Sequence, residues 1–194
     1  DANQRAYSFF RSALDRGGWL SGLLIFQSFS SVILASHVEL IQMHPTMVYF
    51  LQMLVGAGGN AGNQAAVRCI RGLALKTLNR STLSEFLWHE MKMGVVLSVF
   101  LGLVGFLRAA WSPSSALETS SIVISLMLIV LVSVIAGAVL PLLIQYLGAD
   151  PAHASTTIQV IMDISGVAIT MLVTTMMVDS AFAQELSHAF TSSA

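Results

Sequence analysis

The chain has 194 residues, of which 55% are hydrophobic and only 10% are charged, with a net charge of −1. A typical soluble domain is about 25% charged, so this composition and the mean hydropathy of +0.77 predict an integral membrane protein rather than a soluble domain. Nothing in the charge pattern indicates nucleic acid as a partner, and the single cysteine, Cys69, excludes an internal disulfide and a cysteine-based metal cluster.

The predicted organisation is an all-α membrane domain with five spans. Residues 1–17 place Phe9, Phe10 and Leu14 among charges, which suits either an amphipathic helix at the membrane surface or a connecting helix. Residues 18–179 are long enough for five spans of about 20 residues each. Residues 180–194 form a polar C-terminal tail that we expect to be frayed. The five spans are predicted at about residues 19–35, 46–75, 86–111, 121–146 and 152–178.

The first span carries polar side chains that we expect to contact neighbouring helices, namely Gln27, Ser28, Ser30 and Ser31. A short polar loop follows this span. It contains His37, Glu39 and His44, which could attract cations to the mouth of a path or could be a solvated loop. Pro45 then suits the first turn of the second span.

The second span contains an unusual stretch, residues 56–64, with the sequence Gly-Ala-Gly-Gly-Asn-Ala-Gly-Asn-Gln. Glycine allows another backbone or an ion to approach the chain closely. Asn60 lies one turn from Asn63 and from Gln64, so these three amides share a face. Because backbone and amide groups need partners within a membrane, the stretch predicts a polar strip that faces protein or water.

The third and fourth spans contain fewer polar groups. Gly94, Ser98 and Gly102 recur at four-residue spacing, which predicts close helix packing rather than a pore lining. Gly137 and Pro141 are expected to kink the fourth span, and the sequence of residues 148–151 predicts a tight turn before the fifth span.

Basic residues predict the orientation. Eight lie before the first span or around the link between spans two and three, and Arg108 alone lies on the opposite side. The positive-inside rule therefore predicts a cytoplasmic N-terminus and a C-terminus on the other side.

Asp163 is the strongest candidate for chemistry, because a carboxylate deep in a membrane costs about 2.5–3.5 kcal/mol and must face protein or water. Polar or small residues recur along the same face of the fifth span, which indicates an ion or proton site at Asp163. The alternative is a neutral, hydrogen-bonded carboxyl that holds two helices together. The members of this stripe are Thr156, Gln159, Asp163, Gly166, Thr170 and Thr174.

Oxygen ligands favour a hard cation such as Mg²⁺ or Ca²⁺, and Mg²⁺ keeps several waters and takes one or two carboxylates. The methionines are scattered and suit packing rather than copper. Enzyme functions are disfavoured. An intramembrane aspartyl protease needs two deep carboxylates, and the segment from His89 to Met93 lacks the second histidine of a zinc protease motif.

The glycine–asparagine stretch, followed by Arg-Gly-Leu-Ala-Leu at 71–75, resembles the signature of the MgtE magnesium transporter family, to which the eukaryotic solute-carrier magnesium transporters are related. Residues 89–94, 140–143 and 150–152 and the Asp-Ile-Ser-Gly sequence at 163–166 extend the resemblance. Some positions depart from the family pattern: Gln52 stands where many members have proline, Lys76-Thr77 replaces Gly-Glu, and residues 155–157 lack Gly-Pro.

The resemblance implies a homodimer in the lipid membrane, with the ion path at the dimer interface between the second and fifth spans. It implies that Asp163 binds a largely hydrated Mg²⁺, with Ca²⁺, Mn²⁺ or Co²⁺ as alternative ions. The other site residues would be Gly56, Gly59, Asn60, Asn63, Gln64 and Gln159. A separate cytosolic regulatory domain would lie outside these residues.

The predicted function is therefore transmembrane transport of a divalent cation. Two alternatives stay open. One is an exchanger that couples the cation to Na⁺ or H⁺, and the other is a structural membrane protein in which Asp163 has a packing role.

Overall fold

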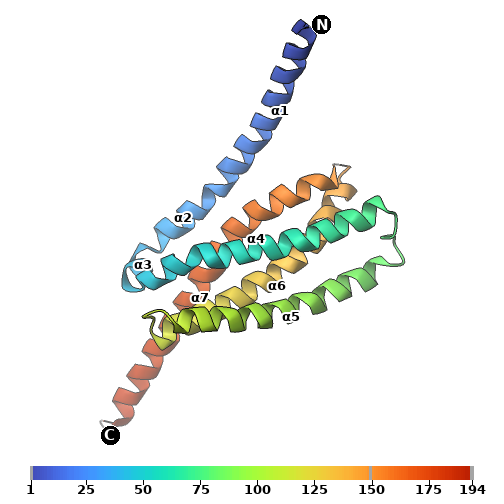
Figure 1. The fold of residues 1–194 in the computed structure, drawn as a ribbon. Coiled ribbons are helices and arrows are strands. Elements are labelled where there is room, and N and C mark those ends of the chain that lie inside the picture. The colour runs from blue at the N-terminus through green and yellow to red at the C-terminus, as the bar shows by residue number, and fades with distance from the viewer. Residues whose placement is uncertain (1, 149, 193–194) are drawn as a thin grey trace.

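The computed structural model describes residues 2–148 and 150–192, which are helical throughout apart from short connections and contain no strand. The prediction of an all-α chain is confirmed (Figure 1). The elements are α1 (Ala2–Gln27), α2 (Phe29–Ser36), α3 (Val38–Met43), α4 (Pro45–Ala74), α5 (Leu83–Ala110), α6 (Ala116–Tyr146), the short 3-10 helix η1 (Pro151–His153) and α7 (Ala154–Ser192).

Four long helices, α4 to α7, form a bundle in which α6 is central and contacts the other three. The main apolar core lies between α4, α6 and α7, with Leu54, Ile129 and Ile158 among its fully buried side chains. The first half of α1 projects away from this bundle, and the far end of α7 projects in the opposite direction (Figure 1). The N-terminal helices pack against the bundle from outside: α1 and α2 contact α7, and α3 contacts α4.

The chain reverses at each connection, so the bundle has two ends. At one end, which we call the His44 end, α4 begins and α5 gives way to α6. At the other, the Lys76 end, α4 gives way to α5 and η1 precedes α7. The ring of Trp19 on α1 lies 5.0 Å from the ring of His153, which places the middle of α1 at the Lys76 end.

Among the residues that the structure describes, four segments are long and apolar enough to cross a membrane: Phe9–Ser36, Leu83–Ala110, Ala116–Tyr146 and Pro151–Phe182. They correspond to the predicted first, third, fourth and fifth spans. The predicted second span is the helix α4, which has the necessary length but is not among the apolar segments, because the glycine–asparagine stretch makes it more polar.

Two helix boundaries differ from those predicted. The helix α1 continues through residue 17 without interruption and ends at Gln27, inside the expected first span. The helix α6 begins at Ala116, one turn earlier than expected, because Ser115 and Glu118 form a capping box at its start.

Pro141 lies within the continuous helix α6, and the kink expected at Gly137 and Pro141 stays a prediction. The last helix differs from expectation. The helix α7 extends to Ser192, through most of the predicted tail, while residues 193–194 and Ala149 of the predicted turn lie outside the description. The turn itself has Gly148 in the left-handed region and Asp150 accepting from the Ala152 N–H at 2.9 Å.

Small residues on α5 pack against α6, as predicted. Gly94, Ser98 and Gly102 are all buried. A β-carbon at Gly94 would lie 3.3 Å from side-chain atoms of Leu131 and Val134, and one at Gly102 would collide with Met127. The glycines therefore permit close approach of the two helices.

The closest backbone contact in the bundle joins α4 to α6. A β-carbon at Gly137 would overlap the backbone carbonyl of Gly62, so both positions need glycine. One turn along α4, the Ser133 hydroxyl donates to the Gly58 carbonyl. Glycines of the glycine–asparagine stretch thus set how closely α4 packs on the central helix α6.

The C-terminal end of α4 carries a Schellman motif. The Thr77 N–H donates to the Gly72 carbonyl at 3.0 Å, and the Lys76 N–H donates to the Leu73 carbonyl at 3.1 Å. This geometry requires Lys76 to adopt a φ of 57°. Glycine usually occupies this position because a β-carbon is strained there.

Replacing Lys76 by glycine should therefore stabilise the protein by about 1 kcal/mol, since it removes the left-handed strain. Reversible unfolding in detergent micelles measures the change. Lys76→Ala is the matched control: it loses the same charge but keeps the β-carbon, so it should not gain this stability. Equal stability of the two variants would contradict the explanation.

Replacing Gly137 by alanine should destabilise the protein by about 1–3 kcal/mol, because the added carbon meets backbone rather than a movable side chain. The control is Gly22→Ala on α1, where a β-carbon would meet nothing within 4 Å. The same unfolding assay should show a loss of stability for the first variant and none for the second.

Candidate cation site

Asp163 lies about two and a half turns into α7, half-buried, with its carboxylate held by two amide groups. The Gln159 Nε2 donates to Oδ1 at 3.0 Å from one turn earlier in the same helix. The Gln27 Nε2, at the end of α1, donates to Oδ2. Both carboxylate oxygens therefore accept a hydrogen bond, one from within α7 and one from another helix.

Asp163 opens onto a groove of about 400 Å³ between α1–α2, α4 and α7. Its polar groups are amides, a hydroxyl and one carboxylate, and its walls are aliphatic. Such a mixture can hold a hydrated cation, because the oxygens offer ligands or hydrogen-bond acceptors while the aliphatic walls limit its size. The lining residues are Gln27, Ser30, Leu34, Val48, Leu51, Gln52, Val55, Gln159, Asp163 and Val167.

The predicted residues Gly59 and Gln159 come together at the edge of this groove. A β-carbon at Gly59 would overlap the Gln159 side-chain amide, so glycine at this position lets the amide lie against α4 and still reach Asp163. Gly56, one turn before Gly59, has open space at its β-carbon position. It therefore lies on the open face of α4.

The predicted amides of α4 are only partly associated with Asp163. Asn60, Asn63 and Gln64 are all exposed. The Asn63 Oδ1 accepts from the Ser155 hydroxyl at 2.6 Å, which ties α4 to the start of α7. Asn63 and Gln64 line a separate hollow of about 350 Å³ with Val67 and Arg68, so the structure does not place them around Asp163.

The polar stripe predicted along α7 is open only in its first half. Thr156 and Gln159 are exposed, whereas Gly166, Thr170 and Thr174 are buried. The two threonine hydroxyls donate to carbonyls of their own helix, at 2.7 Å and 2.8 Å. None of these three residues lines the groove. Their neighbours on α7, Val167 and Met171, pack in an apolar cluster with side chains of α2, α3 and α4.

Sequence reasoning missed the role of Gln27, which was expected only to contact another helix. It does contact another helix, but its partner is Asp163. Ser28 and Ser30, grouped with it, instead donate to the Ile25 and Gln27 carbonyls of their own segment, at 2.6 Å and 2.8 Å. The signal in the sequence was a lone amide side chain near the middle of an apolar segment.

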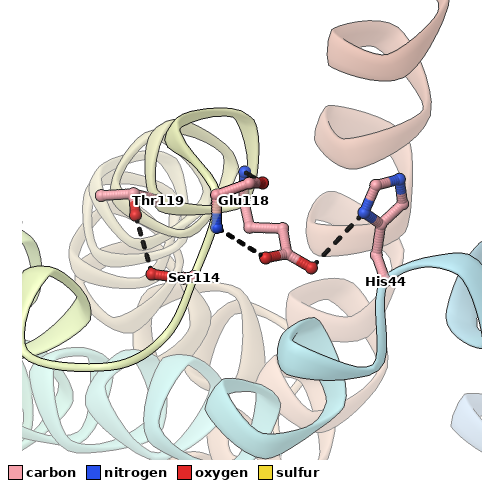
Figure 2. A network of polar contacts seen from close by, with 5 residues as sticks. His44, Ser114, Glu118 and Thr119 are labelled. Atoms are coloured by element: carbon pink, nitrogen blue, oxygen red, sulfur yellow. Dashed lines mark hydrogen bonds and ion pairs between the residues drawn. The ribbon is translucent and has the colours of Figure 1, made fainter.

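At the His44 end, a polar network joins the start of α4 to the start of α6 (Figure 2). The His44 Nδ1 lies 3.4 Å from the Glu118 Oε1. The other carboxylate oxygen of Glu118 accepts from the Ser115 N–H at 2.9 Å, and the hydroxyls of Ser114 and Thr119 lie 2.9 Å apart. His44 thus lies against a carboxylate rather than in a fully solvated loop.

The other loop residues behave differently. His37 and Glu39 line a hollow of about 460 Å³ with Asp179 of α7. The His37 Nδ1 lies 2.8 Å from the Ile33 carbonyl. That His37 and Glu39 attract cations to the mouth of an ion path stays a prediction.

At the Lys76 end, Glu90 of α5 forms an ion pair with Arg68 of α4. Glu90 is only 2% exposed and is paired at 3.3 Å with Arg68, which is 45% exposed. Lys92 instead lies over the ring of Trp88. The Glu90 carboxylate is therefore buried while the Arg68 guanidinium reaches the surface, because the start of α5 packs against the bundle here.

Among the described residues, no group of three or more His, Cys, Asp or Glu side chains could hold a metal ion directly. The groove offers one carboxylate together with amides and one hydroxyl. This donor set suits a cation that keeps its own waters rather than one stripped of them.

Comparisons with known proteins agree with this chemistry. Residues 51–173, which include the glycine–asparagine stretch and Asp163, match the MgtE family, described as a divalent cation transporter. The chain is 29% identical over 168 residues to the magnesium transporter MgtE of Thermus thermophilus, covering 86% of this chain and 37% of that protein. The corresponding protein of Bacillus subtilis is 28% identical over 148 residues, covering 74% and 32%.

A third relative, the magnesium transporter MgtE of Enterococcus faecalis, is 26% identical over 158 residues, covering 80% of this chain and 34% of that protein. The chain thus spans about a third of the length of the relatives that it matches.

Two substitutions of Glu118 separate its two contacts. Glu118→Ala removes the capping box and the contact with His44, and it should destabilise the protein by about 1 kcal/mol or more. Glu118→Gln keeps an oxygen for the Ser115 N–H and loses only the charge. Unfolding in detergent should show a much smaller loss for glutamine than for alanine. Equal losses would mean that the charge, not the cap, is the main contribution.

Proposed function

The chain belongs to the MgtE family of divalent cation transporters, and we propose that it conducts Mg²⁺ across a membrane along a path lined by α4 and α7. Family membership and the apolar helices make it an integral membrane protein. The observation that carries the proposal is the Asp163 carboxylate, half-buried within an apolar helix and open to a polar groove. A carboxylate at this depth must face water or protein.

We propose that α4 is a fifth span. It has 30 residues, or about 45 Å of helix, which exceeds the roughly 30 Å of hydrocarbon. It packs along α6 and α7 between the same two ends. Its amides Asn60 and Gln64 are exposed in the single chain, and such groups need water or protein in a membrane. A second copy of the chain across this face would enclose them and complete the path.

The size of the groove supports a hydrated ion. Six waters occupy about 180 Å³ at roughly 30 Å³ each, and the groove measures about 400 Å³. Mg²⁺ binds most often through one or two carboxylates and retained waters, which one Asp163 in each of two chains would supply. Ca²⁺, Mn²⁺ and Co²⁺ are the competing ions.

The direction of ion movement follows from the distribution of basic residues between the two ends of the bundle. The link between α4 and α5 carries Lys76 and Arg80 at one end, and Arg108 lies at the other. By the positive-inside rule, the Lys76 end is cytoplasmic. An inside-negative potential then favours inward movement by about 4.6 kcal/mol per divalent ion per 100 mV, twice the value for a single charge.

One observation favours a different function. The hydrogen bonds from Gln27 and Gln159 to Asp163 also fit a structural tie between α1 and α7. In that case the carboxyl would hold helices together, and an amide could replace it without effect on ion movement.

Replacing Asp163 by asparagine separates the two functions. We expect Mg²⁺ uptake into proteoliposomes under an inside-negative potential to fall at least tenfold, because the amide has no charge to hold the ion. The control is Asp150→Asn, since Asp150 lies in the turn before α7 and asparagine caps equally well. Wild-type uptake by a folded Asp163→Asn protein would contradict the proposal and favour the structural tie.

A further inference from the structure

The helix of the first span is interrupted beside the proposed ion site. Ser28 alone separates the end of α1 at Gln27 from the start of α2 at Phe29, and it keeps helical dihedrals with its N–H donating to the Leu24 carbonyl at 3.0 Å. Around the break, the Ser31 N–H donates to the Ser28 carbonyl at 3.1 Å, a bond across three residues rather than four. Interrupted helices inside a membrane occur where the backbone lines a cavity or an ion site. The break adjoins the groove, which Gln27 and Ser30 line.

The break is satisfied by local side chains. The Ser28 hydroxyl donates to the Ile25 carbonyl at 2.6 Å, and the Ser30 hydroxyl donates to the Gln27 carbonyl at 2.8 Å. Serine hydroxyls bonded in this way bend helices and compensate carbonyls that have lost a backbone partner. The interruption is therefore supported by the sequence at this position.

The Gln27 side chain connects the break to Asp163. Its amide nitrogen donates to Oδ2 of the carboxylate, while Gln159 donates to Oδ1. Hydrogen bonds to an ionised carboxylate are stronger than those between neutral groups. The waters of a hydrated Mg²⁺ also donate to carboxylate oxygens. Gln27 and an arriving ion therefore compete for the same acceptor.

We propose that Gln27 sets the affinity of the site for a hydrated divalent cation, acting as a positioning residue through Asp163. In the empty site its amide occupies Oδ2 and keeps binding weak. When the ion arrives, the amide gives up this oxygen to the ion's waters, and the break at Ser28 gives the end of α1 freedom to shift. Weak binding matters for a path, since an ion must also leave. This inference rests on the proposed function.

The packing of α1 makes such a shift feasible. Side chains on either side of Gln27 are exposed, including Leu24, Phe26 and Phe29, and the first half of α1 projects away from the bundle (Figure 1). Few interactions would have to break for Gln27 to move.

The test replaces Gln27 by methionine, which has a similar length and cannot donate. We expect the Mg²⁺ concentration for half-maximal uptake into proteoliposomes to fall three- to tenfold, because Oδ2 is then free to accept from the ion's waters. The Mg²⁺ concentration that half-maximally raises the melting temperature in detergent should fall by a similar factor. Gln27→Leu repeats the test if the methionine variant folds poorly.

The matched control is Gln42→Met, which makes the same change at an exposed position of α3 outside the groove and should leave both concentrations unchanged. An unchanged or higher half-maximal concentration in folded Gln27 variants would overturn the inference. Asp163→Asn is measured beside them. If it abolishes uptake while Gln27→Met behaves as wild type, only this inference fails. If it has no effect, the proposed function fails first.

Discussion

Close backbone approach between α4 and its neighbours is the constraint on which the rest of the structure depends. At Gly62 and Gly137 two helices meet with no room for a side chain, and at Gly59 the Gln159 amide takes the space that a β-carbon would fill. In a membrane the hydrophobic effect does not drive helices together, so packing and interhelical hydrogen bonds must do so. The glycines make both possible, as the bond from the Ser133 hydroxyl to the Gly58 carbonyl illustrates.

This packing also explains why a rather polar helix can occupy the bundle. The buried face of α4 packs its glycines and aliphatic side chains against α6 and α7, while the opposite face carries Gln52, Asn60 and Gln64. One helix thus provides a tight internal contact and a polar external one. The internal contact holds α7 in place, and the polar external face needs water or another chain as a hydrogen-bond partner. Of these three amides, Gln52 lines the groove onto which Asp163 opens.

Much of this arrangement could be predicted from the sequence. Helix periodicity and apolar length located four spans, and the spacing of Gly94, Ser98 and Gly102 correctly indicated close packing. Asp163 stood out because a lone carboxylate in an apolar segment is costly. The contacts that the sequence did not predict are long-range. Gln27 lies 136 residues from Asp163, and no local pattern reports such a pairing. The burial of Thr170 and Thr174 arises from tertiary packing, which no periodicity within α7 could reveal.

The covered half of α7 bears on how an ion could reach Asp163. Toward the His44 end, Leu51, Val55, Val167 and Met171 pack with aliphatic side chains of α2 and α3. On the proposed path this cluster is an apolar barrier, and hydrated ions do not cross such barriers readily. Half of it belongs to the segment that follows the break at Ser28. Leu34 of α2 belongs both to this cluster and to the lining of the groove. The first span therefore contributes to the apolar barrier as well as to the site on the proposed path.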